Sequence, residues 1–444
     1  MIAMMFALTG LPTPEQCQTV ALEPEAAYVQ SIGLQGFIYG YPIVDMLTQQ
    51  HNETNKVRQD QPVIAPVNRI AVYPGVLTPA TQGELRAPNA DTLYLNAWFD
   101  LSRGPVLLDV PAMGTRYYTL AFMDLYAKPH HLGTRTNGGK ATRYALIGPS
   151  GGEVPDGYVP FKLPTETAWM LGRVMVDGPE DEPEAKRLAQ AFVVSGSEGP
   201  PVGDSEPMRP MESLLYFELL NRGLKTLPAI PGEEALMALF DSAGFGPGRD
   251  FDLETLSPDQ AKGLGCALLI GPQILSKHGF KPTQSTNGWL LSNAVADPGF
   301  DYLLRAEITR GGYVNAPIES IYPASISDSS GAPLSGTHHY RIRFEEGDLP
   351  PVDAFWSITS YDMKTGQLNE NPIRRYAISD RTEGLHYGTD GSLEIFLSAS
   401  EPAQGASNWL PVPAGAFHVV TRLYLPRPEA LDGRYVLPPI ERIK

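Results

Sequence analysis

The side chains best suited to chemistry are concentrated between Asn89 and Arg135. On the strand expected after Arg116, Tyr118 and Asp124 are six residues apart, so alternation places both on one face. A carboxylate that ends an apolar face is costly to bury unless a cation or donor meets it, and Arg135 or Arg116 is the expected partner. The sequence leaves two interpretations open: a structural ion pair at a strand end, or a cleft carboxylate that acts on a substrate beside a tyrosine.

We predict acid–base roles for this segment. Asp124 or Asp91 would act as the base, and Tyr94 or Tyr118 as the proton donor or orienting group. Arg135 would hold a substrate charge. Side chains from both halves of the chain are expected to bind the substrate, with amides and guanidinium groups on its oxygens and an indole against a ring. These predicted binding residues are Asn89, His131, Arg135, Glu319, His338, Asn371, Arg375 and Trp409.

Two pairs of adjacent histidines, His130-His131 and His338-His339, are the candidate metal ligands. Neighbouring residues of a strand point to opposite faces, so each pair can supply one ligand to a given site. His338 shares its face with Tyr340 and is expected to point inward. The chain has no H-x-x-x-H or H-x-H spacing that would give two zinc ligands from one element. We predict no cofactor, and a divalent metal held by distant residues is the alternative left open.

The stretch Gly148-Pro-Ser-Gly-Gly152 fits the G-x-S-x-G pattern of serine hydrolases. A nucleophile elbow needs a helix directly after the serine, whereas Pro155 and Gly157 here lead into another expected strand. We therefore expect a hairpin turn at this place and no nucleophilic role for Ser150.

Composition excludes several classes of protein. With 43 Gly and 42 Pro among 444 residues, a protein built from long helices or a coiled coil is disfavoured, and many short strands joined by turns are expected. The formal net charge of −16 would repel a phosphate backbone or an anionic membrane surface, so neither nucleic acid nor membrane is an expected partner. No apolar run reaches the roughly 18 residues of a membrane-spanning helix.

The sequence gives only weak indications of the cellular compartment and of whether the two cysteines are bonded to each other. Cys17 and Cys266 are 249 positions apart and are expected to be two unrelated thiols, although a disulfide between them stays open. The apolar start, Met1–Leu8, lacks the basic region of a signal peptide but could be the remainder of one. A periplasmic or secreted location and a cytoplasmic one both remain open.

Four regions must position the candidate residues. An N-terminal extension and helix occupy residues 1–60, and a first β module follows at 61–180. A helical region is expected at 181–310, including a helix from Pro258 with Ser257 and Gln260 as a capping box. A second β module covers 311–444. The predicted fold class is mainly β with helical insertions (α+β), with two antiparallel sandwich-like or jelly-roll-like modules.

The chain resembles two families that usually occur together. The first resemblance, to domain of unknown function 1254, rests on Asn89-Ala-Asp-Thr-Leu-Tyr94, Trp98–Ser102, Arg116-Tyr-Tyr118, Asp124-Leu-Tyr126 and Gly133–Thr136. The second, to domain of unknown function 1214, rests on Tyr302–Arg305, Glu319, Tyr322-Pro323, Phe355-Trp-Ser357, Asn371-Pro372, Asn408–Pro411 and Arg422-Leu-Tyr424. The resemblance implies two β-sandwich or jelly-roll-like modules with helices between and around them. The families carry no agreed reaction.

The expected function is that of a cofactor-independent enzyme, a hydrolase or lyase, acting on a small or medium-sized organic substrate in a cleft between the β modules. The supply of carboxylates, arginines and 20 tyrosines motivates this expectation. A non-catalytic ligand- or glycan-binding protein is the first alternative, because the same aromatic residues would suit it. A metal-assisted phosphoesterase is the second. Beyond the small-molecule substrate, the sequence leaves self-association into a homo-oligomer open.

Overall fold

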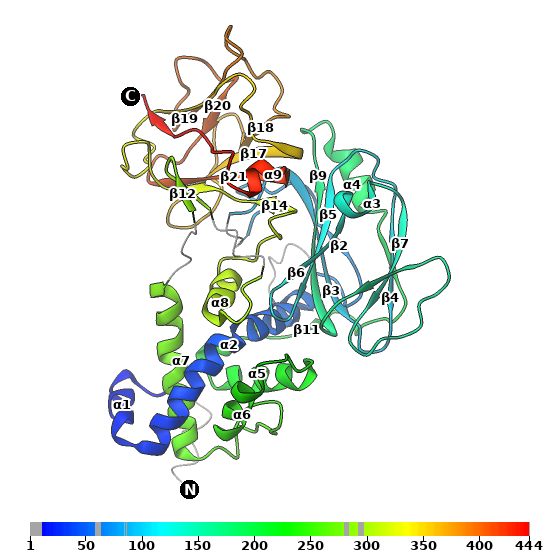
Figure 1. Cartoon of the computed structure of the whole chain (residues 1–444), viewed down its shortest axis with the longest axis vertical. Helices are drawn as coiled ribbons and strands as arrows, with labels where there is room; N and C mark the ends of the chain where they lie inside the picture. The colour runs from blue at the N-terminus through cyan, green and yellow to red at the C-terminus, as the bar shows by residue number, and fades with distance from the viewer. Residues whose placement is uncertain are drawn as a thin grey trace.

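The computed structural model describes residues 11–57, 64–83, 85, 87–278, 284–291 and 297–443. β-sheets occupy two separate parts of the molecule and most helices gather in a third (Figure 1). In that view the helical part lies at the bottom, the N-terminal β module at the right and the C-terminal β module at the top. The predicted α+β class is confirmed.

The helical part is organised around α2 (Pro24–Thr54), which continues through Pro42. Helix α7 (Pro258–His278) packs along it. A Cβ atom on Gly263 would lie only 2.6 Å from the carbonyl oxygen of Ala26, so glycine is needed where the two backbones meet. The other helices of this part are α1 (Pro14–Gln18), η2 (Val20–Leu22), η3 (Pro210–Glu212), α5 (Leu215–Thr226), α6 (Glu234–Ser242) and α8 (Tyr302–Arg310). The N-terminal helix and the middle helices therefore share one core.

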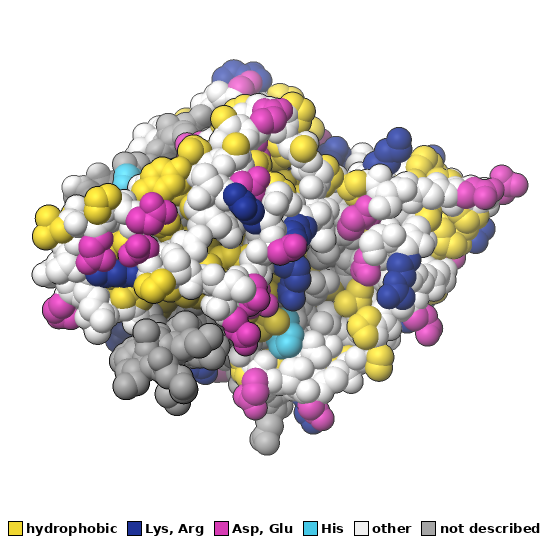
Figure 2. Space-filling model, turned by 90° about the horizontal axis from the view of Figure 1, so that it is seen from below, with side chains coloured by type: hydrophobic (Ala, Val, Ile, Leu, Met, Phe, Trp, Pro, Cys, Tyr) yellow, Lys and Arg dark blue, Asp and Glu magenta, His cyan; other side chains and the backbone are white. Residues whose placement is uncertain are grey.

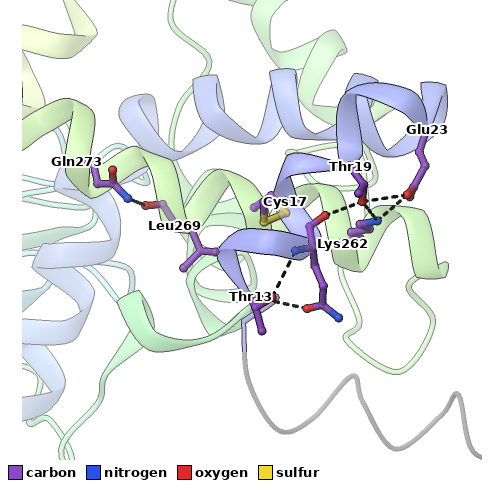
Figure 3. The surroundings of a disulfide bond; sticks show 9 residues. Thr13, Cys17, Thr19, Glu23, Lys262, Leu269 and Gln273 are labelled. Atoms are coloured by element: carbon purple, nitrogen blue, oxygen red, sulfur yellow. Dashed lines mark hydrogen bonds and ion pairs between the residues drawn. A yellow bond between two sulfur atoms is a disulfide. The ribbon is translucent and has the colours of Figure 1, made fainter.

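A disulfide between Cys17 and Cys266 ties α1 to α7 (Figure 3). The two Cα atoms are 5.5 Å apart. Beside the disulfide, Nζ of Lys262 donates to a carboxylate oxygen of Glu23 at 2.7 Å. The expectation of two unrelated thiols is wrong, because only the packing of α1 against α7 brings the two sulfur atoms together.

The N-terminal β module contains two sheets with strand orders β2-β3-β9-β5-β6 and β10-β4-β7-β8. Alternate residues of β3, such as Leu93 and Leu95, share one hydrophobic core with Val106 and Leu108 of β4. Neighbouring strands are antiparallel except β7 with β8. Its elements are β2 (Ala71–Val72), β3 (Thr92–Asp100), β4 (Val106–Val110), β5 (Tyr118–Asp124), β6 (Pro129–Gly133), α3 (Thr134–Asn137), β7 (Thr142–Ile147), β8 (Val159–Lys162), β9 (Thr167–Met175), α4 (Glu182–Ala189) and β10 (Val193–Ser195). A small parallel pair, β1 (Asn55–Lys56) with β11 (Gly203–Asp204), lies beside it.

Strand β9 is the central strand of the five-stranded sheet, between β3 and β5. Sequence analysis does not predict it. Six of its nine residues are buried and the other three are half-buried, so the alternation of polar and apolar residues that marks a half-exposed strand is missing. This strand carries Arg173 on the face opposite the hydrophobic core of the module.

The loop that contains Ser150 connects β7 to β8, and these two strands pair in parallel. The predicted hairpin is therefore wrong, because the chain must cross back before β8 begins. Within residues 148–158, all of which the structure describes, no helix follows Ser150. Its backbone N–H donates to Oε1 of Glu166 at 2.6 Å, and the residue is exposed. A nucleophile elbow is not formed.

The C-terminal β module also consists of two sheets around one core. The larger has the order β12-β13-β15-β21-β17-β18, with β14 paired to β21, and the smaller has the order β20-β19-β16-β22. Tyr340 and Ile342 of the small sheet meet Ile358 and Val419 of the large one. Its elements are β12 (Gln284–Thr286), β13 (Trp289–Leu291), β14 (Ser320–Ile321), β15 (Ala324–Ser325), β16 (Tyr340–Phe344), β17 (Val352–Asp362), β18 (Ala377–Ser379), β19 (Leu393–Ser398), β20 (Trp409–Pro411), β21 (Phe417–Pro426), α9 (Pro428–Leu431) and β22 (Glu441–Arg442). Only β19 and β20 run parallel among its described strand pairs.

Charged side chains of both signs are intermixed on the helical end of the molecule, with hydrophobic side chains between them (Figure 2). Among the described helices, none is both long enough and apolar enough to cross a membrane. The apolar start, Met1–Leu8, lies outside the described residues.

Candidate functional site

A cavity of about 450 Å³, which we call the central cavity, lies where the three parts of the molecule meet. Its walls come from α2, from β3 and β9 of the N-terminal β module, from the segment after α8, and from β21 of the C-terminal β module. The cavity is therefore bounded by both β modules, as expected for the predicted cleft, and also by α2, which the sequence-based prediction did not include.

Strand pairing explains how the sheet forms one wall. On β3 and β9, Tyr94 lies opposite Arg173 and Asn96 lies opposite Leu171, and all four side chains line the cavity. Leu95, between Tyr94 and Asn96, points into the hydrophobic core of the N-terminal β module, and the residue opposite it on β9 is Gly172. One face of the sheet thus packs into the hydrophobic core, and the other face lines the cavity.

Two buried arginines form a basic wall. Arg173 and Arg422 are 8% and 4% exposed. Nη1 of Arg173 donates to Oδ1 of Asn315 at 3.1 Å, and its guanidinium group lies 5.4 Å from the centre of the Tyr94 ring. Arg422 donates to the hydroxyl oxygen of Tyr361 at 2.6 Å and to backbone and hydroxyl oxygens nearby. Within the described residues, neither guanidinium group is in an ion pair with a carboxylate.

Two carboxyl groups from α2 form the acidic wall. Oδ2 of Asp45 accepts hydrogen bonds from the Tyr313 hydroxyl at 2.5 Å and from Nε2 of Gln49 at 2.6 Å. Oε2 of Glu53 accepts from Asn96 at 2.9 Å. Burial raises the pKa of Asp45 and the pKa of Glu53 above their usual values, and the hydrogen bonds offset this in part. Both groups therefore hold a proton to a higher pH than exposed carboxyl groups do.

Two tyrosine hydroxyl groups are oriented by a single amide residue. The backbone N–H of Asn89 donates to the Tyr94 hydroxyl oxygen at 3.2 Å, and its Nδ2 donates to the Tyr424 hydroxyl oxygen at 3.0 Å. Each phenol oxygen is thus an acceptor, and its own O–H has no acceptor among the described residues. All three residues line the cavity, but Tyr424 is fully buried whereas Tyr94 is 7% exposed, so of the two O–H groups it is that of Tyr94 that is available to donate to a bound molecule.

Of the predicted site residues, Asn89 and Tyr94 line the central cavity. Asp91 is buried nearby and accepts a hydrogen bond from the Ser357 hydroxyl at 2.6 Å, with Arg381 at 3.5 Å. It thus joins the two β modules and does not line the cavity.

Three other predicted residues meet at the boundary between the β modules. Nε of Arg135 donates to Oε2 of Glu319 at 2.9 Å, so residues predicted from opposite halves of the chain are in contact. The Ala316 N–H donates to Nε2 of His131 at 3.1 Å, which leaves the proton on Nδ1, 3.2 Å from the Thr119 hydroxyl. Burial, followed by nearby Arg173, lowers the pKa of His131 to about 3, so this imidazole is neutral at physiological pH. None of the three lines the cavity.

The expected pairing of Asp124 with Arg135 or Arg116 is wrong. Asp124 accepts from the backbone of the turn between β5 and β6 and pairs with Nε2 of His130 at 3.0 Å. Arg116 instead pairs with Asp181. The tight turn brings His130 back beside the strand end, and this local partner replaces the distant one. Tyr118 points into the core of the N-terminal β module, so neither residue reaches the cavity.

The remaining candidates hold the C-terminal β module together. Asn371 bonds to the backbone of Arg375, and Nη1 of Arg375 donates to three carbonyl oxygens around Trp409. Trp409 is 2% exposed and donates to Ser398, so its ring is not available for stacking on a ligand. His338 precedes β16, is half-buried and packs edge-on against Tyr340. None of the four lines the central cavity.

Sequence analysis missed most of the cavity residues, although some left a signal. Asp45, Gln49 and Glu53 are four residues apart, a spacing that places them on one face of a helix. Arg173 and Arg422 each interrupt an apolar strand. Among the described residues, no group of three or more His, Cys, Asp or Glu side chains is arranged to hold a metal ion. The metal-dependent alternative therefore gains no candidate site there.

Comparisons with known proteins concern the fold and the family. Residues 67–195 match the family model described as "Protein of unknown function (DUF1254)", and residues 319–428 match "Protein of unknown function (DUF1214)". No curated protein matches the sequence. The crystal structure of the VPA0106 protein from Vibrio parahaemolyticus is 24% identical, with a TM-score of 0.71 over 94% of this chain and 100% of that one. A putative uncharacterized protein from Burkholderia cenocepacia is 13% identical, with a TM-score of 0.46 over 97% of this chain and 96% of that one.

The VPA0106 structure shows that the fold of this chain is shared over nearly its whole length. The two family matches occur in the order, and in the halves of the chain, that the sequence motifs indicated. The chain belongs to the proteins that combine a DUF1254 domain with a following DUF1214 domain.

Proposed function

We propose that this protein is an enzyme that needs no organic cofactor and uses acid–base chemistry, as a hydrolase or a lyase, on a small organic substrate in the central cavity. The observation that carries the proposal is the pairing of Asp45 with Tyr313 on one wall of a cavity whose other wall is basic. A carboxyl group with a raised pKa beside a phenol is suited to moving a proton near neutral pH.

Tyr313 is held in a conformation that a tyrosine rarely adopts. Its backbone φ is 61°, and it follows the pair Gly311-Gly312 at the cavity wall. Such a backbone costs on the order of 1–3 kcal/mol and persists where the surrounding structure requires it. The conformation directs the Tyr313 hydroxyl to Asp45, which supports a role for this pair in proton transfer.

The other wall could stabilise charge that develops on the substrate. The free O–H group of Tyr94 and the guanidinium groups of Arg173 and Arg422 are already in place before a ligand binds. Donors that need no reorganisation are the most effective stabilisers of a developing oxyanion. Among the described residues that line the cavity there is no serine, cysteine, lysine or histidine. Direct proton transfer is therefore favoured over a covalent intermediate on such a residue.

A non-catalytic ligand-binding protein is the second candidate. Hydrogen bonds between protein groups hold the cavity walls in place, for example those of Arg422 to Thr359 and Tyr361. A preformed cavity with a few fixed polar groups suits binding as well as catalysis. The two candidates differ in whether the bound molecule changes chemically.

For the frame of the site, we infer that each β module is a sandwich of the jelly-roll type. Each module has two sheets that share one hydrophobic core, which supports this arrangement. Such a frame is rigid and leaves function to its surface-facing strand positions and loops.

The test is a turnover screen of the purified protein against small esters, lactones and hydroxy acids, followed by NMR. For any substrate found, Asp45→Asn is expected to lower turnover by about a hundredfold or more while the protein stays folded. Asp353→Asn, at an exposed carboxylate, is the matched control and should leave turnover unchanged. Turnover that survives Asp45→Asn would refute the proposed mechanism. Binding without turnover of any compound would favour the ligand-binding candidate.

A further inference from the structure

The guanidinium group of Arg173 has donors that the protein does not use. Only its Nη1 bonds to a described residue, Asn315. Its Nε and Nη2 have no hydrogen-bond partner among the described residues. Neither of them is one of the fully buried polar atoms that lack a partner. Because Arg173 is 8% exposed and lines the central cavity, these N–H groups face the cavity space.

The charge of this wall is also unbalanced. An arginine stays protonated at any physiological pH, and burying its charge without a counter-ion is costly. In the described part of the chain, no carboxylate oxygen is within ion-pair distance of Arg173 or Arg422. Asp91, which lies between Asn89 and Tyr94 in the sequence, bonds to Ser357 and Arg381 and not to Arg173 or Arg422. An anion that enters the cavity would supply the missing negative charge.

We propose that the substrate is an aromatic or cyclic carboxylic acid whose carboxylate is bound by Arg173 through two parallel hydrogen bonds. The proposal deepens the proposed function and rests on it. A planar guanidinium edge with two free N–H groups matches the two oxygens of a carboxylate. The O–H group of Tyr94 can donate to one of the same oxygens, and Arg422 adds a second positive charge to this wall.

Successive side chains of β9 point to opposite faces of the sheet, and those on the cavity face indicate what the rest of the substrate is. Arg173, Leu171 and Trp169 follow one another along the cavity face of this strand, roughly 7 Å apart at each step. With the carboxylate at Arg173, the next part of the molecule lies against Leu171, with Val420 also in the lining. These apolar surfaces favour a ring over a hydroxylated chain.

The far end of the substrate would then reach the acid–base pair. Tyr313 packs edge-on against Trp169, with ring centres 5.1 Å apart, and its hydroxyl bonds to Asp45. The reacting bond is therefore expected at the end of the molecule opposite the carboxylate.

The test is calorimetric titration of the full chain with benzoate and with benzamide, which has the same shape without the charge. Benzoate is expected to bind at least tenfold more tightly than benzamide. Arg173→Gln should remove this preference, and Arg173→Lys, which keeps the charge but not the planar edge, should weaken benzoate binding by fivefold or more. Arg143→Gln, at an exposed arginine of β7, is the matched control and should bind benzoate as the wild type does.

Equal affinity for benzoate and benzamide, or tight benzoate binding by Arg173→Gln, would overturn the proposal. Tighter binding of inorganic phosphate than of benzoate would also overturn it.

Circular dichroism of each variant shows whether it is folded. If Arg173→Gln does not fold, the benzoate affinity of Arg173→Lys still tests the proposal. Charge-dependent benzoate binding that persists in Asp45→Asn supports the substrate class even if no turnover is found. Turnover of neutral compounds alone would support the enzyme and refute the carboxylate.

Discussion

Arg135 of the N-terminal β module and Glu319 of the C-terminal β module form an ion pair, with Nε 2.9 Å from Oε2. The Glu319 side chain is 1% exposed, and its other oxygen accepts from the Tyr117 hydroxyl at 3.0 Å. Tyr117 packs against Tyr424, which lines the central cavity. This contact between the two modules is thus one residue away from the cavity wall.

The first prediction concerns this ion pair. Glu319→Gln keeps an oxygen for Tyr117 but removes the charge, so the free energy of unfolding should fall by about 1–3 kcal/mol. The loss is moderate because 32% of the Arg135 side chain is exposed to solvent. Urea unfolding measures it. Glu198→Gln, which breaks the exposed pair with Arg69, is the control and should change stability by less than about 0.5 kcal/mol. Equal losses in the two variants would contradict the prediction.

The second prediction concerns the pH dependence of stability at Glu53. Burial raises its pKa, so the folded state keeps this proton while the unfolded state loses it above about pH 4. The contribution of Glu53 to stability is therefore complete below that pH and declines as the pH rises through the folded-state pKa. Glu53→Gln keeps an acceptor for Asn96 and Trp98 and should gain stability relative to wild type between about pH 4 and pH 7. A difference in unfolding free energy that does not change with pH would contradict this.

The third prediction concerns His131, whose contribution to stability changes with pH in the opposite direction to that of Glu53. Burial lowers its pKa to about 3, so between about pH 6.5 and pH 3 the unfolded state takes up a proton that the folded state does not. This residue should therefore reduce stability as the pH falls through that range. NMR titration of the imidazole should show no protonation at pH 5. Titration of His131 near pH 6.5 in the folded protein would show that it is not enclosed as described.

The fourth prediction concerns the disulfide. Unfolded protein kept under non-reducing conditions should show no reaction of Cys17 or Cys266 with a thiol reagent. The double variant Cys17→Ala, Cys266→Ala should lose about 2–5 kcal/mol of stability, because the unfolded chain is no longer closed into a long loop. Reductant should lower the melting temperature of the wild type and leave that of the double variant unchanged. Complete labelling of the untreated wild type would contradict the prediction.

Features that depend on neighbouring residues could be read from the sequence. The capping box at the start of α7 is formed, with the Gln260 N–H 3.2 Å from Ser257 Oγ and the Ser257 N–H 3.0 Å from Gln260 Oε1. The alternation expected for the strand after Arg116 is likewise present in β5, where Tyr118, Leu120 and Phe122 share the core face. Local hydrogen bonds and strand periodicity act within a few residues, and a single sequence carries them completely.

The cavity could not be read in the same way. Asp45, Tyr94, Arg173 and Arg422 lie on four separate elements, and only the packing of α2 and both β modules brings them together. The same reason explains why Asp124 found a partner on the adjacent strand, His130 of β6, while Arg135 found one 184 residues away. A charged side chain pairs with whichever group the folded chain places within reach. That choice is made by the burial of apolar surface between distant segments, which no local pattern of residues records.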